Sequence, residues 1–272
     1  MAKPTIVLDK NYLQGSTAAH MLQLAQSHQL LMADVLFYEL ISSSEPGRSR
    51  CFAKFPKIEN PVILVNHVGA LLKQEIESHE ACGKPSTRYE DIRFQFNEAL
   101  TGANYALPPS AAEAPQEQTA ELREDVERFL DRVRLIPTLI PNLLEGTSAE
   151  RQSLREAAEE VIATNTDAML KFYGSLEVPS GELPLPPATI MTRDWALFRW
   201  QQVQLLFALD AYCRYGGRVP DTLSGKAYEK IEHDVLDAHY LLLGTLEGSF
   251  ATREKKLQRW FGLLCPDGQL YS

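Results

Sequence analysis

The two ends of the chain alternate between short apolar runs and helix-forming segments, and this alternation limits the fold more than any other feature. Residues 4–8 form an apolar, partly β-branched run that indicates a buried strand, and residues 30–33 form a second one. A helix is expected from Ser16 or Thr17 to about residue 28, and another over residues 35–42. Because strand, helix, strand, helix is the order of a parallel sheet with crossover helices, the sequence predicts an α/β fold.

The middle of the chain carries mainly helical signals. Helices are predicted over residues 61–82, 88–100, 120–136, 148–176 and 191–215. The fourth opens on a capping box formed by Thr147 and Glu150, and Pro137 and Pro141 are expected to interrupt the segment that follows the third. Residues 101–119 are rich in Ala, Pro and Gln and are predicted to form a loop.

The C-terminal part returns to the α/β pattern. Helices are predicted over residues 221–231, 234–246 and 254–261, and strands over residues 249–252 and 263–266. The sequence therefore predicts a discontinuous α/β core, residues 1–50 and 215–272, with a central parallel sheet. A large all-α insertion, residues 51–214, would separate its two parts.

Composition limits the class of protein. The chain has 272 residues and a net charge of −9, which is unusual for a protein that binds phosphates but bears mainly on solubility. Its four cysteines form no C-x-x-C pair, so a reducing compartment is expected and a cysteine zinc site is not. Apolar stretches are too short for a membrane span, and we expect a soluble cytoplasmic protein without a membrane partner.

Acidic residues follow the predicted strands or lie on the helices beside them. Asp9 ends the first strand in the series Asp9-x-Asn11-x-Leu13, and Glu39 lies on the second helix. Near the C-terminus the chain reads Asp234-x-x-Asp237-x-x-Tyr240 and then Thr252-x-Glu254-Lys255-Lys256-Leu257.

This series resembles the PIN-like nuclease family, over about a third of the chain. The resemblance implies a three-layer α/β domain whose catalytic residues are Asp9, Glu39, Asp237 and Glu254. It also implies a Mg²⁺ or Mn²⁺ site built from Asp9, Asp234, Asp237 and Glu254, with Asn11 and Thr252 as orienting residues. The chain departs from the family at Glu254, where the family usually has aspartate.

The chemistry of these residues agrees with that resemblance. Ligand sites in open parallel sheets form beyond the carboxyl ends of the strands, where Asp9 and Glu254 are expected. Carboxylate oxygens without cysteine or histidine select Mg²⁺ or Mn²⁺ over zinc. We therefore expect hydrolysis of a phosphodiester by a metal-activated water.

Two groups of basic residues are candidates for binding nucleic acid. The group nearest the acids consists of Lys10, Arg253, Lys255, Lys256 and Arg259. A second group follows the Glu39 helix and consists of Arg48, Arg50, Lys54 and Lys57. The resemblance favours RNA over DNA as the substrate, and so an endoribonuclease.

Two other functions remain open. One is a catalytically lapsed PIN-like protein that acts as an interaction or regulatory module. The other is a metal-dependent phosphatase on a similar sheet. The helical insertion would shape a substrate channel, form a homodimer or bind a partner protein.

Overall fold

A computed structural model describes residues 3–43, 45–58, 60–89, 102, 114–177, 183–218 and 225–272. The chain divides into two compact units. The first consists of Met1–Leu71, Gly83–Ala120 and His239–Ser272, and the second of Leu72–Cys82 and Glu121–Ala238. These boundaries differ from those expected from the sequence, which placed the core at residues 1–50 and 215–272 and the insertion at residues 51–214.

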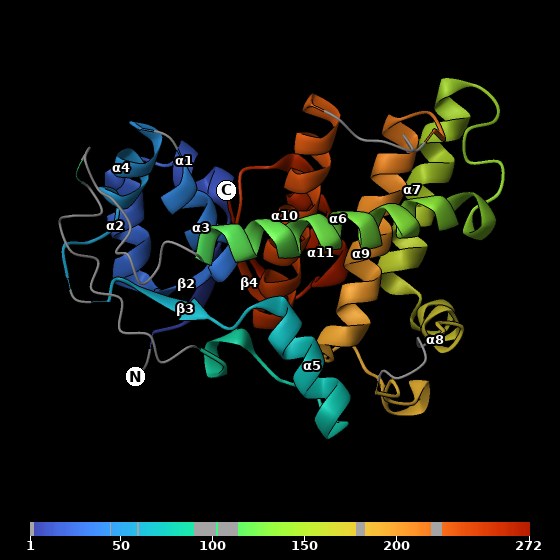
Figure 1. The fold of residues 1–272 in the computed structure, drawn as a ribbon, viewed down its shortest axis with the longest axis horizontal. Helices are drawn as coiled ribbons and strands as arrows, with labels where there is room; N and C mark the ends of the chain where they lie inside the picture. Colours follow the sequence, from blue (N-terminus) through green and yellow to red (C-terminus); the bar gives the residue numbers. More distant parts are fainter. Residues whose placement is uncertain are drawn as a thin grey trace. The chain divides into compact units, whose positions relative to one another are not determined.

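A five-stranded parallel sheet forms the centre of the first unit, and helices flank it. The strands are β1 (Thr5–Leu8), β2 (Gln29–Ala33), β3 (Val62–Val65), β4 (Ser249–Ala251) and β5 (Gln269–Tyr271). Their order is β3-β2-β1-β4-β5, so strands from both ends of the chain share one sheet (Figure 1). All four pairings are parallel, which confirms the predicted α/β class with a central parallel sheet.

The order of the strands creates a switch point between β1 and β4. From β1 the chain proceeds outward to β2 and β3, whereas β4 and β5 extend from the other side of β1. Val7 pairs with Phe250 and Leu8 with Ala251, so these two strands end side by side. Crevices at the carboxyl ends of strands at such a point are the usual ligand sites of open α/β sheets.

Four helices follow the N-terminal strands: α1 (Lys10–Gly15), α2 (Ala18–Ser27), α3 (Asp34–Ser42) and α4 (Gly47–Phe52). The cap that we expected for α2 is confirmed, because the Thr17 hydroxyl accepts a hydrogen bond from the His20 backbone amide. Ala33 is the N-cap residue of α3, and Asp34 is the first residue of the helix. The sequence analysis did not predict α1 or α4.

The helix predicted over residues 61–82 is wrong in its first part. Val62–Val65 form the edge strand β3, and the helix α5 covers Val68–Ser78. A 3₁₀ turn, η1 (Pro85–Thr87), follows. Because β3 belongs to the sheet, residues 51–214 are not an all-helical segment. The helix predicted over residues 88–100 lies almost entirely outside the described residues, as does most of the loop predicted over residues 101–119.

The C-terminal elements differ from the prediction in two places. One continuous helix, α10 (Lys226–Glu247), replaces the two helices predicted over residues 221–246, the first of which begins outside the described residues. After β4, α11 covers Lys255–Leu264, so the strand predicted over residues 263–266 is wrong. The last strand, β5, begins at Gln269, three residues after the end of that predicted strand.

Helices build the second unit. They include α6 (Ala114–Leu139), α7 (Ser148–Thr164), α8 (Thr166–Gly174), the 3₁₀ turn η4 (Ala188–Ile190) and α9 (Ala196–Arg214). The capping box of Thr147 and Glu150 is confirmed. The helix predicted to end at residue 136 continues through Pro137 to Leu139, and Asn165 divides the helix predicted over residues 148–176 by capping α8.

The N-terminus of α9 is capped by a side chain from a distant part of the chain. Trp195 is the N-cap residue and provides no side-chain hydrogen bond. The fully buried carboxylate of Glu75 instead accepts hydrogen bonds from the backbone amides of Ala196 and Leu197, both at 2.8 Å. A carboxylate at a helix N-terminus satisfies free amides and interacts favourably with the helix dipole.

Of the helices that the structure describes, none has the length and hydropathy that crossing a membrane requires.

Candidate functional site at the switch point of the sheet

Asp9 and Thr252 follow the two strands that meet at the switch point. Asp9 comes directly after β1, and its backbone amide donates to the Ala251 carbonyl of β4 at 3.0 Å. Thr252 comes directly after β4, and its hydroxyl donates to Asp9 Oδ2 at 2.6 Å. Both residues are fully buried. The sheet topology therefore joins residues that are 243 positions apart in the sequence.

Asp9 also holds the start of α1. Its Oδ1 accepts a hydrogen bond from the Asn11 backbone amide at 3.3 Å, which makes Asp9 the N-cap of that helix. The side chain of Asn11 points to a different acid, because its Nδ2 donates to Glu254 Oε2 at 3.1 Å. Asn11 thus links Asp9 and Glu254, and Thr252 supports the same two residues by accepting from the Glu254 amide at 3.1 Å.

Glu39 lies on α3 and is almost buried, with a side-chain exposure of 7%. Its Oε1 accepts from Lys10 Nζ at 2.5 Å, and its Oε2 accepts a hydrogen bond from the hydroxyl of Tyr240. Lys10 was expected to bind nucleic acid, whereas here it pairs with a catalytic candidate. Tyr240 was part of the quoted motif but had no assigned role, although its spacing from Asp234 and Asp237 follows the helical period.

The pKa of Asp9 is raised from 3.8 to about 6. Burial is the largest cause, and the negative charges of Glu254 and Glu39 raise the pKa further. The hydrogen bonds from Thr252 and Asn11 act in the opposite direction. Glu39 and Glu254 are therefore close enough to Asp9 for their charges to oppose its ionisation.

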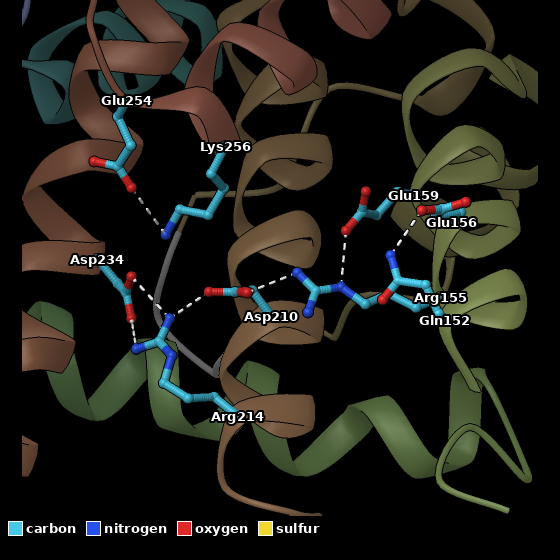
Figure 2. Close-up of polar contacts among 9 residues, drawn as sticks. All are labelled: Gln152, Arg155, Glu156, Glu159, Asp210, Arg214, Asp234, Glu254 and Lys256. Atoms are coloured by element: carbon cyan, nitrogen blue, oxygen red, sulfur yellow. Dashed lines mark hydrogen bonds and ion pairs between the residues drawn. The ribbon is translucent and has the colours of Figure 1, made fainter. Parts of the chain in front are cut away.

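Asp234 lies in the second unit and belongs to an ion-pair network (Figure 2). Arg214 Nη1 donates to Asp234 Oδ2 at 2.6 Å, and Nη2 donates to Oδ1 at 3.1 Å. Arg214 also pairs with Asp210, which accepts from Arg155 Nη2 at 2.7 Å. Both oxygens of Asp234 thus face a guanidinium.

Asp237 lies three residues after Asp234 on α10 and is half-buried. The division between the two compact units falls just after it, between Ala238 and His239. The structure brings Asp9, Glu39 and Glu254 together within the first unit, and Asp234 and Asp237 belong to the second.

Two members of the predicted basic group, Arg253 and Lys256, contact other groups of the first unit. A side-chain nitrogen of Arg253 donates to the Gly15 carbonyl at the end of α1. Lys256 forms an ion pair with Glu254 (Figure 2). The two charged groups are 3.7 Å apart, and Lys256 Nζ lies 5.3 Å from the centre of the Trp260 ring. Lys255 and Arg259 are exposed on α11.

Lys54, from the second basic group, also supports α1. Its Nζ donates to the carbonyls of Leu13 and Gln14, both at 2.7 Å. Cations at a helix C-terminus satisfy free carbonyls and interact favourably with the dipole. Lys54 and Arg253 therefore fix the short helix that carries Lys10 and Asn11.

Within the described residues, no group of three or more Asp, Glu, His or Cys side chains is arranged so that it could hold one metal ion. The acids at the switch point nevertheless have the donor chemistry of a hard divalent cation. Asp9, Glu39 and Glu254 offer only oxygen atoms, and the charges of Glu39 and Glu254 act on Asp9.

Comparisons of the chain with family models, with curated proteins and with solved structures find no match.

Proposed function

We propose that the chain is a PIN-like, Mg²⁺- or Mn²⁺-dependent endonuclease, and that its active site lies at the switch point between β1 and β4. The observation that carries this proposal is the buried Asp9, with a pKa near 6 and with Glu39 and Glu254 acting on it. A buried acid with a strongly shifted pKa at the carboxyl end of central strands is a candidate for a functional site.

The side chains around Asp9 hold the acids in position. Thr252 and the Asn11 amide fix both oxygens of Asp9, and the Asn11 side chain fixes Glu254. Lys10 and Tyr240 fix the two oxygens of Glu39. Such support from neighbouring groups keeps carboxylates in a defined arrangement before a substrate binds.

Asp9 and Glu254 would hold the cation, with Glu39 beside them, because their oxygen donors suit Mg²⁺ and Mn²⁺. A bound ion would activate water and neutralise charge on the scissile phosphate. Asp237 is retained as a fourth catalytic residue on the basis of the family motif. Asp234 is a weaker candidate, because both of its oxygens already accept hydrogen bonds from Arg214.

RNA is the proposed substrate, on the basis of the resemblance. Lys255 and Arg259 are exposed on the helix that begins directly after Glu254. Cations at such positions would attract the phosphate backbone regardless of sequence. Lys10, Arg253 and Lys256 belong to the same proposed group, and each also contacts another group of the protein.

Cleavage of a labelled single-stranded RNA with Mn²⁺ tests this function. We expect the wild type to cleave it and EDTA to abolish cleavage. Mutating a residue that only hydrogen-bonds a metal ligand typically lowers metal affinity or activity by about 10–100-fold. Asp9→Asn removes a ligand itself, so it should lower the rate of cleavage by more than about 100-fold. The exposed Asp267 provides a matched control, and Asp267→Asn should cleave like the wild type.

Equal cleavage by wild type and Asp9→Asn protein would contradict the proposal. Turnover of a small phosphomonoester without cleavage of RNA would instead indicate a metal-dependent phosphatase.

A catalytically lapsed PIN-like interaction protein is the second candidate. Two observations favour it: Lys10 already compensates the charge of Glu39, and glutamate occupies position 254 where the family usually has aspartate. This candidate predicts no cleavage with Mg²⁺ or Mn²⁺, together with a stable homodimer or heterocomplex in light scattering. Cleavage that depends on Asp9 would rule it out.

A further inference from the structure

A cavity of about 320 Å³ lies within the second unit, among α6, α7, α8 and α9. Every residue that lines it is apolar, including Ile136, Leu154, Val161, Met169, Phe172 and Leu205. The volume is at the lower end of the range of small-molecule sites, about 300–1,000 Å³. An apolar lining of this kind selects for a hydrocarbon group and provides no partner for a polar one.

The cavity is open to solvent along one side. Leu154 of α7 is 38% exposed and Val161 of the same helix is 47% exposed, although both line the cavity. Leu139 at the end of α6 is 43% exposed. A ligand can therefore reach the cavity without rearrangement of the four helices, and covering these side chains would remove apolar surface from water.

A cation lies beside this apolar space. The guanidinium of Arg132 is 5.8 Å from the centre of the Phe172 ring, and Phe172 lines the cavity. Arg132 also precedes the lining residue Ile136 by one helical turn on α6. Both Arg132 and Phe172 are half-buried, and Arg132, which does not line the cavity itself, lies beside it through its contact with Phe172.

Arg132 is partly removed from water, and its neighbour Asp131 acts on its charge. Burial lowers the pKa of Arg132, and the charge of Asp131 only partly opposes this effect. Asp131 itself is 74% exposed and pairs with Arg134 at 2.6 Å. A partly desolvated guanidinium gains more from an anion than an exposed one does.

We propose that this cavity binds a free medium-chain alkyl carboxylate, with its hydrocarbon chain among α6–α9 and its carboxylate on Arg132. The combination of apolar lining and neighbouring cation carries the proposal, because it matches both parts of such a molecule. This site does not depend on the proposed nuclease function, because neither Arg132 nor any lining residue is among those proposed to bind metal or nucleic acid.

Isothermal titration calorimetry with decanoate below its micelle concentration tests the proposal on the full chain. We expect saturable binding of decanoate that is at least about tenfold tighter than binding of decan-1-ol, because only the acid can pair with Arg132. Arg132→Gln should remove this preference for the acid. Arg134→Gln on the same helix is the matched control and should keep it.

Filling the cavity provides an independent arm of the test. Ala158 lines the cavity on α7, and Ala158→Phe should abolish binding of both decanoate and decan-1-ol. Ala149→Phe, at an exposed position of the same helix, should leave both unchanged. Circular dichroism would verify that each variant is folded.

Several outcomes would overturn the proposal. They are decanoate binding that is unchanged in Arg132→Gln or Ala158→Phe, equal binding of decyltrimethylammonium, and absence of saturable binding. Association of two copies that is lost in Val161→Lys, without any decanoate binding, would show that a second chain covers these side chains instead.

Discussion

Asp9 is a buried acid whose ionisation opposes folding. Its pKa is about 6 in the folded protein and 3.8 in the unfolded reference state, so the folded protein holds more protons between these pH values. The free energy of unfolding should therefore fall as pH rises through this window, and the full penalty is present above pH 6. A difference of this size corresponds to about 3 kcal/mol.

Asp9→Asn should accordingly stabilise the protein at pH 7.5, by up to about 3 kcal/mol. The gain should disappear below about pH 4, where Asp9 is protonated in both states. Urea denaturation of wild type and variant in the presence of EDTA measures this difference. A variant that is less stable than wild type at pH 7.5 would contradict the assigned cause of the pKa shift.

Divalent metal provides a second readout at the same residue. If Asp9 helps to hold Mn²⁺, saturating metal should raise the melting temperature of the wild type and should raise that of Asp9→Asn much less. This measurement does not depend on catalysis. Equal stabilisation of both proteins by Mn²⁺ would place metal binding elsewhere.

At the scale of elements, an ion-pair network joins three helices of the second unit. Arg214 of α9 contacts Asp234 of α10, and Arg155 of α7 contacts Asp210 of α9. Burial would lower the pKa of Arg214, but hydrogen bonds and charges from Asp234 and Asp210 outweigh it and raise the pKa. The network thus balances three carboxylates, Glu159 included, with two guanidinium groups.

Arg214→Met should destabilise the protein by about 3–5 kcal/mol, because it leaves two nearly buried carboxylates without their common cation. Arg128→Met is the matched control on α6, where the arginine side chain is 68% exposed, and it should cost less than about 1 kcal/mol. Thermal unfolding of both variants measures the contrast. Similar small losses would show that Arg214 is screened by solvent.

Replacing a glycine inside a helix by alanine usually stabilises a protein. At Gly244 of α10 the close contact with β4 should make this substitution destabilising instead. A Cβ atom at Gly244 would lie 2.8 Å from two ring atoms of the fully buried Phe250. Gly244→Ala should therefore destabilise the protein by about 1–3 kcal/mol. Gly262 of α11 has open space around it, so Gly262→Ala should stabilise it by up to about 1 kcal/mol. Denaturation curves with the same sign for both variants would contradict this contact.

Elements with a strong local signal could be predicted from the sequence. β1 and β2 are compact apolar runs, and Thr147 begins a helix through its own side chain. β3 was predicted as helix because its four apolar residues lead directly into the apolar positions of α5. A strand buried on both faces has no alternating pattern that would distinguish it from a buried helix. β5 has two exposed residues among its three and so carries little apolar signal.

The candidate site was predictable to a similar extent. Asp9 follows an obvious strand, and the parallel topology then places it beside the residue that follows β4. The partners of Glu39 were not predictable, because the contact with Lys10 depends on the short helix α1. The C-terminal carbonyls of that helix accept hydrogen bonds from Lys54 and Arg253, which are distant from it in sequence. From the sequence alone, both residues were candidates for binding phosphate.

At the scale of the whole molecule, the sheet depends on both ends of the chain. Strands β4 and β5 cover one edge of β1 and lie within the last 24 residues, Ser249–Ser272. Truncation after Glu247 should expose the β1 edge and remove Thr252, so we expect loss of near-ultraviolet circular dichroism and poor solubility. Removal of Ser272 alone is the control and should have little effect. A native-like truncated protein would show that β4 is dispensable.

The hydrogen bond between Thr252 and Asp9 has a consequence during protein synthesis. Ribosomes add about 5–20 residues per second, so the 243 positions between these residues take roughly 12–50 s to translate. Throughout that interval Asp9 has neither Thr252 nor Glu254 beside it. The nascent chain therefore carries an incomplete site until Thr252 and Glu254 have been synthesised and can reach Asp9.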